Sequence, residues 1–271
     1  MTRPEAWDSG PAYERYAGRW SRLVAVEFLR WLAPRPGLAW AEVGCGTGAL
    51  ASTILAKAEP SSVVGIDSSE GFVATARQRV GDPRAHFDTG DATHLPWATA
   101  SLDVTVSGLV LNFVRDQDAM VREMARVTRP GGRVAAYVWD YAGGMQMMRF
   151  FWDAATAISP HDAKLDQAER FPLCQPGPLQ ALFERAGLEG VTVRAVEIPT
   201  VFENFDDYWQ PFLGRTGAAP TYLASAPDEI RERIRRHLKA RLAPTSDAPI
   251  TLTARAWAVR GAVDTGRPLT T

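Results

Sequence analysis

Short apolar runs alternate with helical patterns through the first half of this chain. The runs predict five strands, which read LAWAEV, SVVGID, RAHFDTG, LDVTVSG and GRVAAYVW. Between them, apolar residues at helical spacing predict helices over residues 49–58, 70–80 and 118–128. Strands that alternate with helices in this way indicate an α/β fold of the doubly wound kind, in which helices cover both faces of a parallel sheet.

The pattern changes at both ends of this core. Residues 13–32 have helical spacing and stop before the breaker that begins at Pro34, which predicts an N-terminal lid helix. Two helical interruptions follow Tyr141 and Phe202, and the second ends in a charged amphipathic helix over 228–241. Around them we predict a helix at 179–186 and strands at 191–198 and 250–259. We expect one domain over residues 1–271, with a core at about 36–140 and cover insertions at about 141–178 and 202–246.

The composition indicates a globular protein and gives no sign of a nucleic-acid-binding, metal-binding or membrane-spanning one. The 271 residues are 46% hydrophobic and 23% charged, which is typical of a globular protein. Thirty Lys and Arg against 31 Asp and Glu give a net charge of -1, so no overall field favours nucleic acid or an anionic membrane. Two cysteines, Cys45 and Cys174, lack the spacing of a zinc site and predict neither a disulfide framework nor a metal site. No apolar run approaches the roughly 20 residues of a membrane span, and we expect a cytoplasmic protein.

The strongest chemical motif is EVGCGTG, which lies between the first predicted strand and the first predicted helix. Its glycines let a ligand approach the backbone, and the helix N-terminus beyond them offers N–H groups to an anion. The spacing is G-x-G-x-G, because Ala49 stands where a dinucleotide fingerprint has its third glycine. Glu42, two residues before the first glycine, would repel a diphosphate and favour a ligand that carries an ammonium and a sulfonium. The alternative is a βα turn whose glycines only allow tight packing.

Two aspartates follow the next predicted strands. Asp67 ends the second strand, where a carboxylate can accept hydrogen bonds from both ribose hydroxyls, a feature that NAD-binding proteins share. Asp91 ends the third strand and could bind the exocyclic amine of adenine, with the backbone N–H of Ala92 nearby. The alternatives are a helix-capping role for Asp67 and a Gly-Asp turn at Asp91.

Five motifs, in this order and spacing, resemble those of class I S-adenosylmethionine (SAM)-dependent methyltransferases, particularly the ubiquinone/menaquinone-biosynthesis-like branch. They are EVGCGTG, VVGID, GDATHLPW, LDVTVSGLVLNFV and EMARVTRPGGRV. The resemblance implies a Rossmann-like sheet of seven strands, the last antiparallel, with SAM across the carboxyl ends of strands one to four. It also implies a set of cofactor-binding residues: Glu42, Gly44, Cys45 and Gly46 near the methionine portion, Asp67 and Ser68 near the ribose, Asp91 and Ala92 near the adenine, and Ser107 near the ammonium. Glu42 replaces the commoner Asp, which preserves the charge.

The lid helix and the aromatic residues supply the remaining candidates. The resemblance implies that Arg19 meets the methionine carboxylate and Tyr16 adds a hydroxyl contact, although both could be core or surface residues. Aromatic residues outside the motifs could line an acceptor pocket or could hold the insertions to the sheet. The substrate candidates are Asn112, Phe113, Trp139, Tyr141, Trp152 and Trp209.

These residues predict an enzyme that transfers the methyl group of SAM to carbon, oxygen or nitrogen of a small molecule and releases S-adenosylhomocysteine. Positioning can supply much of the acceleration of such a displacement. We assign no catalytic base, although Asp140, Tyr141, His94 and His161 are possible. The alternatives are an NAD(P)-dependent oxidoreductase and a SAM-fold protein that binds the cofactor without transferring the methyl group.

Overall fold

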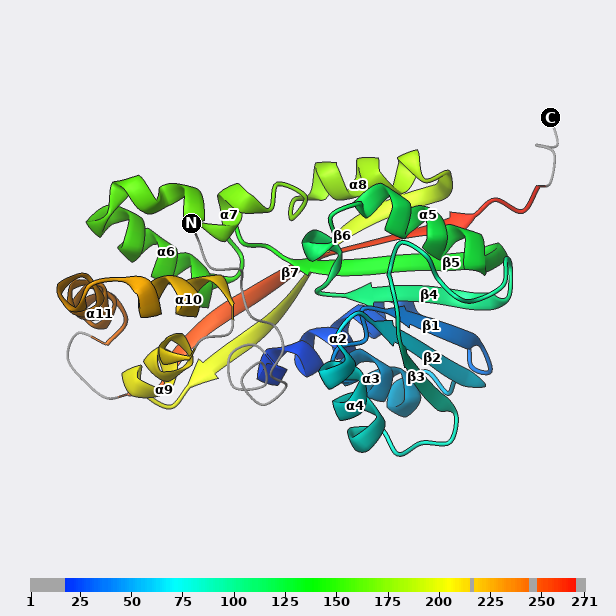
Figure 1. Cartoon of the computed structure of the whole chain (residues 1–271), viewed down its shortest axis with the longest axis horizontal. Coiled ribbons are helices and arrows are strands. Elements are labelled where there is room, and N and C mark those ends of the chain that lie inside the picture. Colours follow the sequence, from blue (N-terminus) through cyan, green and yellow to red (C-terminus); the bar gives the residue numbers. More distant parts are fainter. Residues whose placement is uncertain (1–17, 215–216, 244–247, 267–271) are drawn as a thin grey trace. The chain divides into compact units, whose positions relative to one another are not determined.

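A computed structural model describes residues 18–214, 217–243 and 248–266 (Figure 1). The contacts within the chain group these residues into two compact units. We call residues 21–138, 173–196 and 257–266 the sheet unit, and the described residues of 18–20, 139–172 and 197–256 the helical unit. The prediction of one domain with two insertions stays a prediction.

The strands form one seven-stranded sheet in the order β3-β2-β1-β4-β5-β7-β6, and the last strand is antiparallel. β1 pairs in parallel with β2 and β4, β2 with β3, and β4 with β5. This arrangement confirms the predicted fold class. The strands are β1 (Ala39–Val43), β2 (Ser62–Asp67), β3 (Ala85–Thr89), β4 (Leu102–Gly108), β5 (Thr128–Trp139), β6 (Leu188–Phe202) and β7 (Ile250–Val263).

Helices cover the central strands of the sheet unit. Four consecutive residues of both β1 and β4 are buried, which requires cover on the two faces of the sheet. Two helices begin with side-chain caps, since Ser69 accepts a bond from the N–H of Phe72 and Asp116 from the N–H of Ala119. The helices are α2 (Arg19–Leu32), α3 (Ala49–Lys57), α4 (Glu70–Arg79), α5 (Gln117–Val127) and α8 (Pro176–Arg185), with a short η2 turn (Leu111–Phe113) after β4.

The start of β5 differs from the prediction. The sequence predicts a helix as far as Thr128 and a strand that starts at Gly132, whereas β5 already begins at Thr128, opposite Leu102. The register then shifts before Arg133 pairs with Val104. Gly131 has a φ of 75°, which lets the chain bulge between the two stretches of pairing.

Helices make up most of the helical unit, which confirms the helical character predicted for both interruptions. Its core is aromatic: Phe151 stacks on Phe212 with ring centroids 4.6 Å apart, and Trp152 lies 5.4 Å from Tyr222. The elements are α6 (Gln146–Ile158), η3 (Pro160–Leu165), α7 (Gln167–Arg170), α9 (Phe205–Trp209), η4 (Gln210–Leu213), α10 (Ala218–Ser225) and α11 (Asp228–Leu242).

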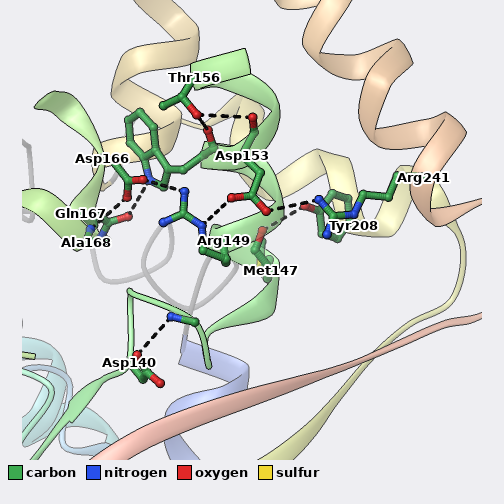
Figure 2. Close-up of polar contacts among 12 residues, drawn as sticks. Asp140, Met147, Arg149, Asp153, Thr156, Asp166, Gln167, Ala168, Tyr208 and Arg241 are labelled. Atoms are coloured by element: carbon green, nitrogen blue, oxygen red, sulfur yellow. Dashed lines mark hydrogen bonds and ion pairs between the residues drawn. The ribbon is translucent and has the colours of Figure 1, made fainter. Parts of the chain in front are cut away.

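A polar network centred on Arg149 joins several of these helices (Figure 2). The Nε of Arg149 donates to Asp153 at 2.7 Å, and its Nη2 donates to Asp166 at 2.6 Å. Asp153 also accepts a bond from Arg241 of α11 at 3.2 Å. Asp166 in addition caps α7 by accepting a bond from the N–H of Ala168. Arg149 therefore holds two carboxylates at once and fixes α6 against the segment before α7.

The described residues include no helix that is both long enough and apolar enough to span a membrane.

Candidate cofactor-binding site

The glycine loop leaves the carboxyl end of β1 in a left-handed conformation. Gly44, Gly46 and Gly48 have φ values of 77°, 51° and 82°, which residues with side chains rarely adopt. A Cβ atom on Gly44 would lie 2.5 Å from Cγ1 of Val110, so the side chain of Val110 closes this side of the loop. A Cβ atom on Gly46 would meet nothing within 4 Å. The loop therefore presents open backbone at Gly46 rather than at Gly44.

Four N–H groups of this loop are hydrogen-bonded within the protein. Those of Gly44 and Cys45 both donate to the carbonyl of Ile66, at 2.7 and 2.9 Å, and that of Gly48 donates to the carbonyl of Cys45. The N–H of Gly46 donates to a side chain, that of Asp67. These four N–H groups therefore have acceptors within the protein, and the expectation that the helix N-terminus beyond the glycines offers N–H groups to an anion stays a prediction. This arrangement suits a ligand that does not bring a diphosphate to the loop.

Glu42 places an acceptor without a partner beneath the loop. Its side chain is 2% exposed, and Oε2 has no hydrogen-bond partner among the described residues. Burial raises the pKa of the Glu42 carboxyl well above its usual range, the backbone of Ala51 lowers it by a hydrogen bond, and the charge of Asp67 raises it further. A buried carboxyl in this state is stabilised by a cation such as an ammonium group.

Asp67 fastens two loops together. One carboxylate oxygen accepts the N–H of Gly46 and the other accepts the N–H of Ser69, each at 2.9 Å. Burial raises the pKa of Asp67, and these backbone bonds oppose the shift. The capping alternative is thus part of its role, and each oxygen retains a lone pair for a ligand hydroxyl. Ser68, between Asp67 and Ser69, is exposed.

Asp91 forms the turn that the sequence offered as an alternative. Its Oδ1 accepts the N–H and the hydroxyl of Thr93, both at 2.8 Å. These bonds and the neighbouring His94 lower the pKa of the exposed Asp91 carboxyl. Ala92 is half-buried beside it. The contact of Asp91 and Ala92 with adenine stays a prediction, and it would engage the second oxygen of Asp91.

Two further polar side chains at the end of β4 lack partners. Ser107 is fully buried, and its hydroxyl has no partner among the described residues. Asn112, in the η2 turn, is 5% exposed, and neither atom of its amide is hydrogen-bonded there. Each buried polar group without a partner costs about 1–3 kcal/mol. Unpaired groups beside the carboxyl ends of parallel strands are typical of a ligand site, and Phe113, 38% exposed, follows them.

Cys45 is an inert member of the loop. Its side chain is buried, and burial raises the pKa of the thiol, with the charges of Glu42 and Asp67 acting in the same direction. The thiol therefore stays protonated and does not act as a nucleophile.

The remaining candidates lie in the helical unit or outside the described residues. Tyr16 lies outside them. Arg19 donates to both oxygens of Asp207, at 3.1 and 3.3 Å. The aromatic candidates Trp139, Tyr141, Trp152 and Trp209 are all buried in the helical unit. Their contact with an acceptor stays a prediction.

The candidate bases differ in their exposure and in their partners. Asp140 is buried and accepts a hydrogen bond from Nε of Arg255 at 2.7 Å. His94 and His161 have side chains that are 85% and 80% exposed. No catalytic base is assigned among these residues and Tyr141.

Known proteins match both the sequence and the fold. The methyltransferase domain family matches residues 41–136. Methyltransferase GfsG of Streptomyces halstedii is 34% identical over 188 residues, which are 66% of this chain and 64% of that protein. Demethylmenaquinone methyltransferase of Beutenbergia cavernae is 34% identical over 173 residues, which are 60% of this chain and 70% of that enzyme. The chain belongs to the class I SAM-dependent methyltransferases.

The cofactor of this methyltransferase family is SAM, and the relatives place the chain in the branch that includes the ubiquinone/menaquinone biosynthesis enzymes. Phosphoethanolamine N-methyltransferase 2 of Haemonchus contortus, solved in complex with SAM, has the same fold. Its TM-score is 0.57 at 19% identity, over 93% of this chain and 56% of that one. Membership in the methyltransferase family excludes the NAD(P)-dependent alternative. The unpaired Glu42 oxygen and the open backbone at Gly46 fit a cationic cofactor.

Sequence reasoning missed some residues of interest. Val110, which closes on Gly44, reads as one apolar residue in a run of several. Thr200 in β6 is fully buried and its hydroxyl lacks a partner among the described residues. The alternation of buried and exposed residues along VEIPTVF could have indicated that Thr200 points into the core.

Proposed function

We propose that this protein transfers the methyl group of SAM to a small-molecule acceptor and releases S-adenosylhomocysteine. The observation that carries the proposal is the buried Glu42 oxygen without a partner, set beside the open backbone of Gly46. A carboxyl at this place binds a cation far better than it binds a diphosphate. Family membership supplies the identity of that cation.

The residues of the sheet unit would hold the cofactor as follows. Glu42 and Ser107 would bind the ammonium of the methionine portion, which lies against Gly44, Cys45 and Gly46. Asp67, followed by Ser68, would accept bonds from the ribose hydroxyls. Asp91 and Ala92 would bind the adenine. SAM supplies an electrophilic methyl group on a sulfonium, and the protein fixes its orientation so that a nucleophile can approach in line.

We further propose that the acceptor is partly apolar and is methylated at carbon, oxygen or nitrogen. Phe113 offers an exposed ring and Asn112 a buried amide without partners after β4. The name of the Beutenbergia cavernae relative adds demethylated quinones to the acceptors worth testing. We also propose a cytoplasmic location, which the two free cysteines support.

The first test is calorimetric titration of the full chain with SAM, S-adenosylhomocysteine and NAD. We expect the first two to bind and NAD to bind at least about tenfold more weakly, because the N–H groups of Gly44, Cys45, Gly46 and Gly48 already have acceptors within the protein. The Glu42→Gln variant is the matched control, since it keeps the shape and removes the charge. Equal affinity for NAD would contradict the proposal.

The second test separates transfer from mere binding. Labelled methyl transfer from SAM is measured over quinones, phenols, amines and polyketides. Transfer to one class identifies the acceptor. Tight SAM binding without transfer to any class would support a SAM-fold protein that does not methylate.

A further inference from the structure

The guanidinium of Arg19 is held by one carboxylate and two aromatic rings. Its Nη1 donates to both oxygens of Asp207 on α9. The guanidinium carbon lies 4.4 Å from the ring centroid of Trp20 and 4.8 Å from that of Phe202. Two aromatic rings and one carboxylate therefore fix the plane of the guanidinium.

The opposite edge of the same guanidinium is unsatisfied. Nε and Nη2 of Arg19 are shielded from solvent and have no hydrogen-bond partner among the described residues. These two nitrogens form the side of the planar fork that binds a carboxylate with two parallel bonds. Leaving such charged donors buried and unpaired is costly, so a missing partner is indicated.

Two further groups without partners belong to Trp20, which contacts Phe202, and to Thr200, which shares the buried face of β6 with Phe202. Trp20 packs edge-on against Phe202 with centroids 5.5 Å apart, is 6% exposed, and has an unpaired indole N–H. Thr200 precedes Phe202 by two residues on the buried face of β6, and its hydroxyl is also unpaired. The neighbourhood thus offers several donors and one charged donor edge.

Two other arginines of the helical unit each contact two carboxylates, whereas Arg19 contacts one among the described residues. Arg149 donates from Nε to Asp153 and from Nη2 to Asp166, so each of these nitrogens has a carboxylate (Figure 2). Arg255 likewise contacts two carboxylates, Asp140 at 2.7 Å and Glu197 at 3.4 Å. Arg19 has one.

We infer that the Nε and Nη2 edge of Arg19, together with Trp20 and Thr200, is a binding site within the helical unit for the carboxylate or comparable oxyanion of a small molecule. An aromatic carboxylate matches the site, since the rings of Trp20 and Phe202 flank the donor edge.

The charge of Asp207 and the burial of the two Arg19 nitrogens determine how an oxyanion can bind at this edge. Asp207 already balances Arg19, so an incoming carboxylate makes the group resemble Arg149 with its two aspartates. No solvent reaches the two nitrogens in the structure, so a neighbouring side chain must rotate to admit the oxygen atoms. The bound oxyanion is then desolvated, which strengthens its bond to Arg19.

The test uses the ¹⁵N-labelled full chain, saturated with S-adenosylhomocysteine and titrated with benzoate or, as the neutral comparison, benzamide. The indole N–H resonance of Trp20, assigned with Trp20→Phe, reports the site directly. We expect benzoate to shift it with a dissociation constant on the order of 1 mM, and benzamide to bind more weakly. Affinity for S-adenosylhomocysteine is measured separately by calorimetry and tests the proposed function by itself.

Arg19→Lys keeps the charge but removes the fork, and we expect it to weaken benzoate binding about tenfold or more. The matched control is Arg235→Lys, because Arg235 also pairs with an aspartate, Asp206, and lies over a ring, that of Phe205. That variant should leave benzoate binding unchanged. Asp207→Asn should strengthen benzoate binding by removing the competing charge.

Three results would overturn the inference. Benzoate that leaves the Trp20 resonance unmoved shows that the edge binds no carboxylate. Equal benzoate affinity in Arg19→Lys and the wild type shows that the fork is not used. A loss of affinity for S-adenosylhomocysteine in Arg19→Lys, with benzoate binding unchanged, assigns the edge to the methionine carboxylate of the cofactor instead.

Discussion

The titration of Glu42 makes a testable prediction about cofactor binding. In the protein without ligand, burial holds the pKa of this carboxyl well above its ordinary value of 4.5, so the carboxyl keeps its proton at mildly acid pH. In the proposed complex, the ammonium of SAM favours the charged carboxylate of Glu42 and lowers that pKa. Cofactor binding therefore releases a proton, and affinity rises as the pH rises toward the raised pKa and levels off above it.

The magnitude follows from the difference between the two pKa values. Each unit of difference corresponds to about 1.4 kcal/mol, or tenfold in affinity. Above the raised pKa, Glu42→Gln removes a hydrogen bond to a charged group, worth about 1.5–3 kcal/mol, or about 10- to 150-fold in affinity. At acid pH the variant and the wild type should converge, because both then present a neutral side chain.

The assay is calorimetry with SAM over a series of pH values, in two buffers that differ in ionisation enthalpy. A buffer-dependent heat in the wild type measures the released proton. Glu42→Gln is the control for titration of the ligand's own amino group, since that contribution is common to both proteins. The reasoning fails if wild type and variant show the same affinity and the same proton release at every pH.

Further variants separate folding from binding. Gly44→Ala should lower the free energy of unfolding by at least about 1–2 kcal/mol, because the residue has a positive φ and Val110 fills the space that a Cβ atom would need. Gly46→Ala should lower the free energy of unfolding by about 1 kcal/mol and mainly weaken SAM binding. Urea unfolding and calorimetry on both variants check this prediction, and equal losses of stability would refute it. Asp67→Ala should reduce both SAM affinity and stability, because its two backbone bonds contribute about 0.5–1.5 kcal/mol each, and an unchanged affinity would remove the residue from the site. Arg149→Met should lower the free energy of unfolding by about 3–5 kcal/mol by leaving Asp166 buried without its partner, and adding Asp166→Asn should restore part of the loss; a double variant no more stable than the single one would argue against the network.

Much of the sheet could be predicted from local pattern. β2 and β4 occupy the predicted residues, because apolar runs bounded by polar residues specify buried parallel strands. The early start of β5 could not be predicted, since the pairing of Thr128 with Leu102 depends on a bulge at Gly131 that local propensity treats as a turn. The pairing of Thr128, at the end of α5, with Leu102 of β4 depends on the tertiary fold, so no local sequence pattern predicts it.

The sequence indicated several candidate residues of the site, but not the hydrogen bonds and ion pairs that these residues form. The glycine loop and Asp67 follow from motif and position, but the hydrogen bonds of the loop N–H groups depend on the neighbouring strand. The Arg19 ion pair joins residues 188 positions apart, so no spacing in the sequence indicates it. The unpaired atoms of Glu42 and Asn112 are likewise a product of tertiary burial.

The double attachment of Asp67 has a consequence for engineering. Replacing that aspartate releases the amides of Gly46 and Ser69. A redesign must then provide each amide with a new acceptor before the altered pocket can keep its shape. Under the proposed function, ribose binding and the architecture of the loop depend on the same carboxylate, so they have to be altered together.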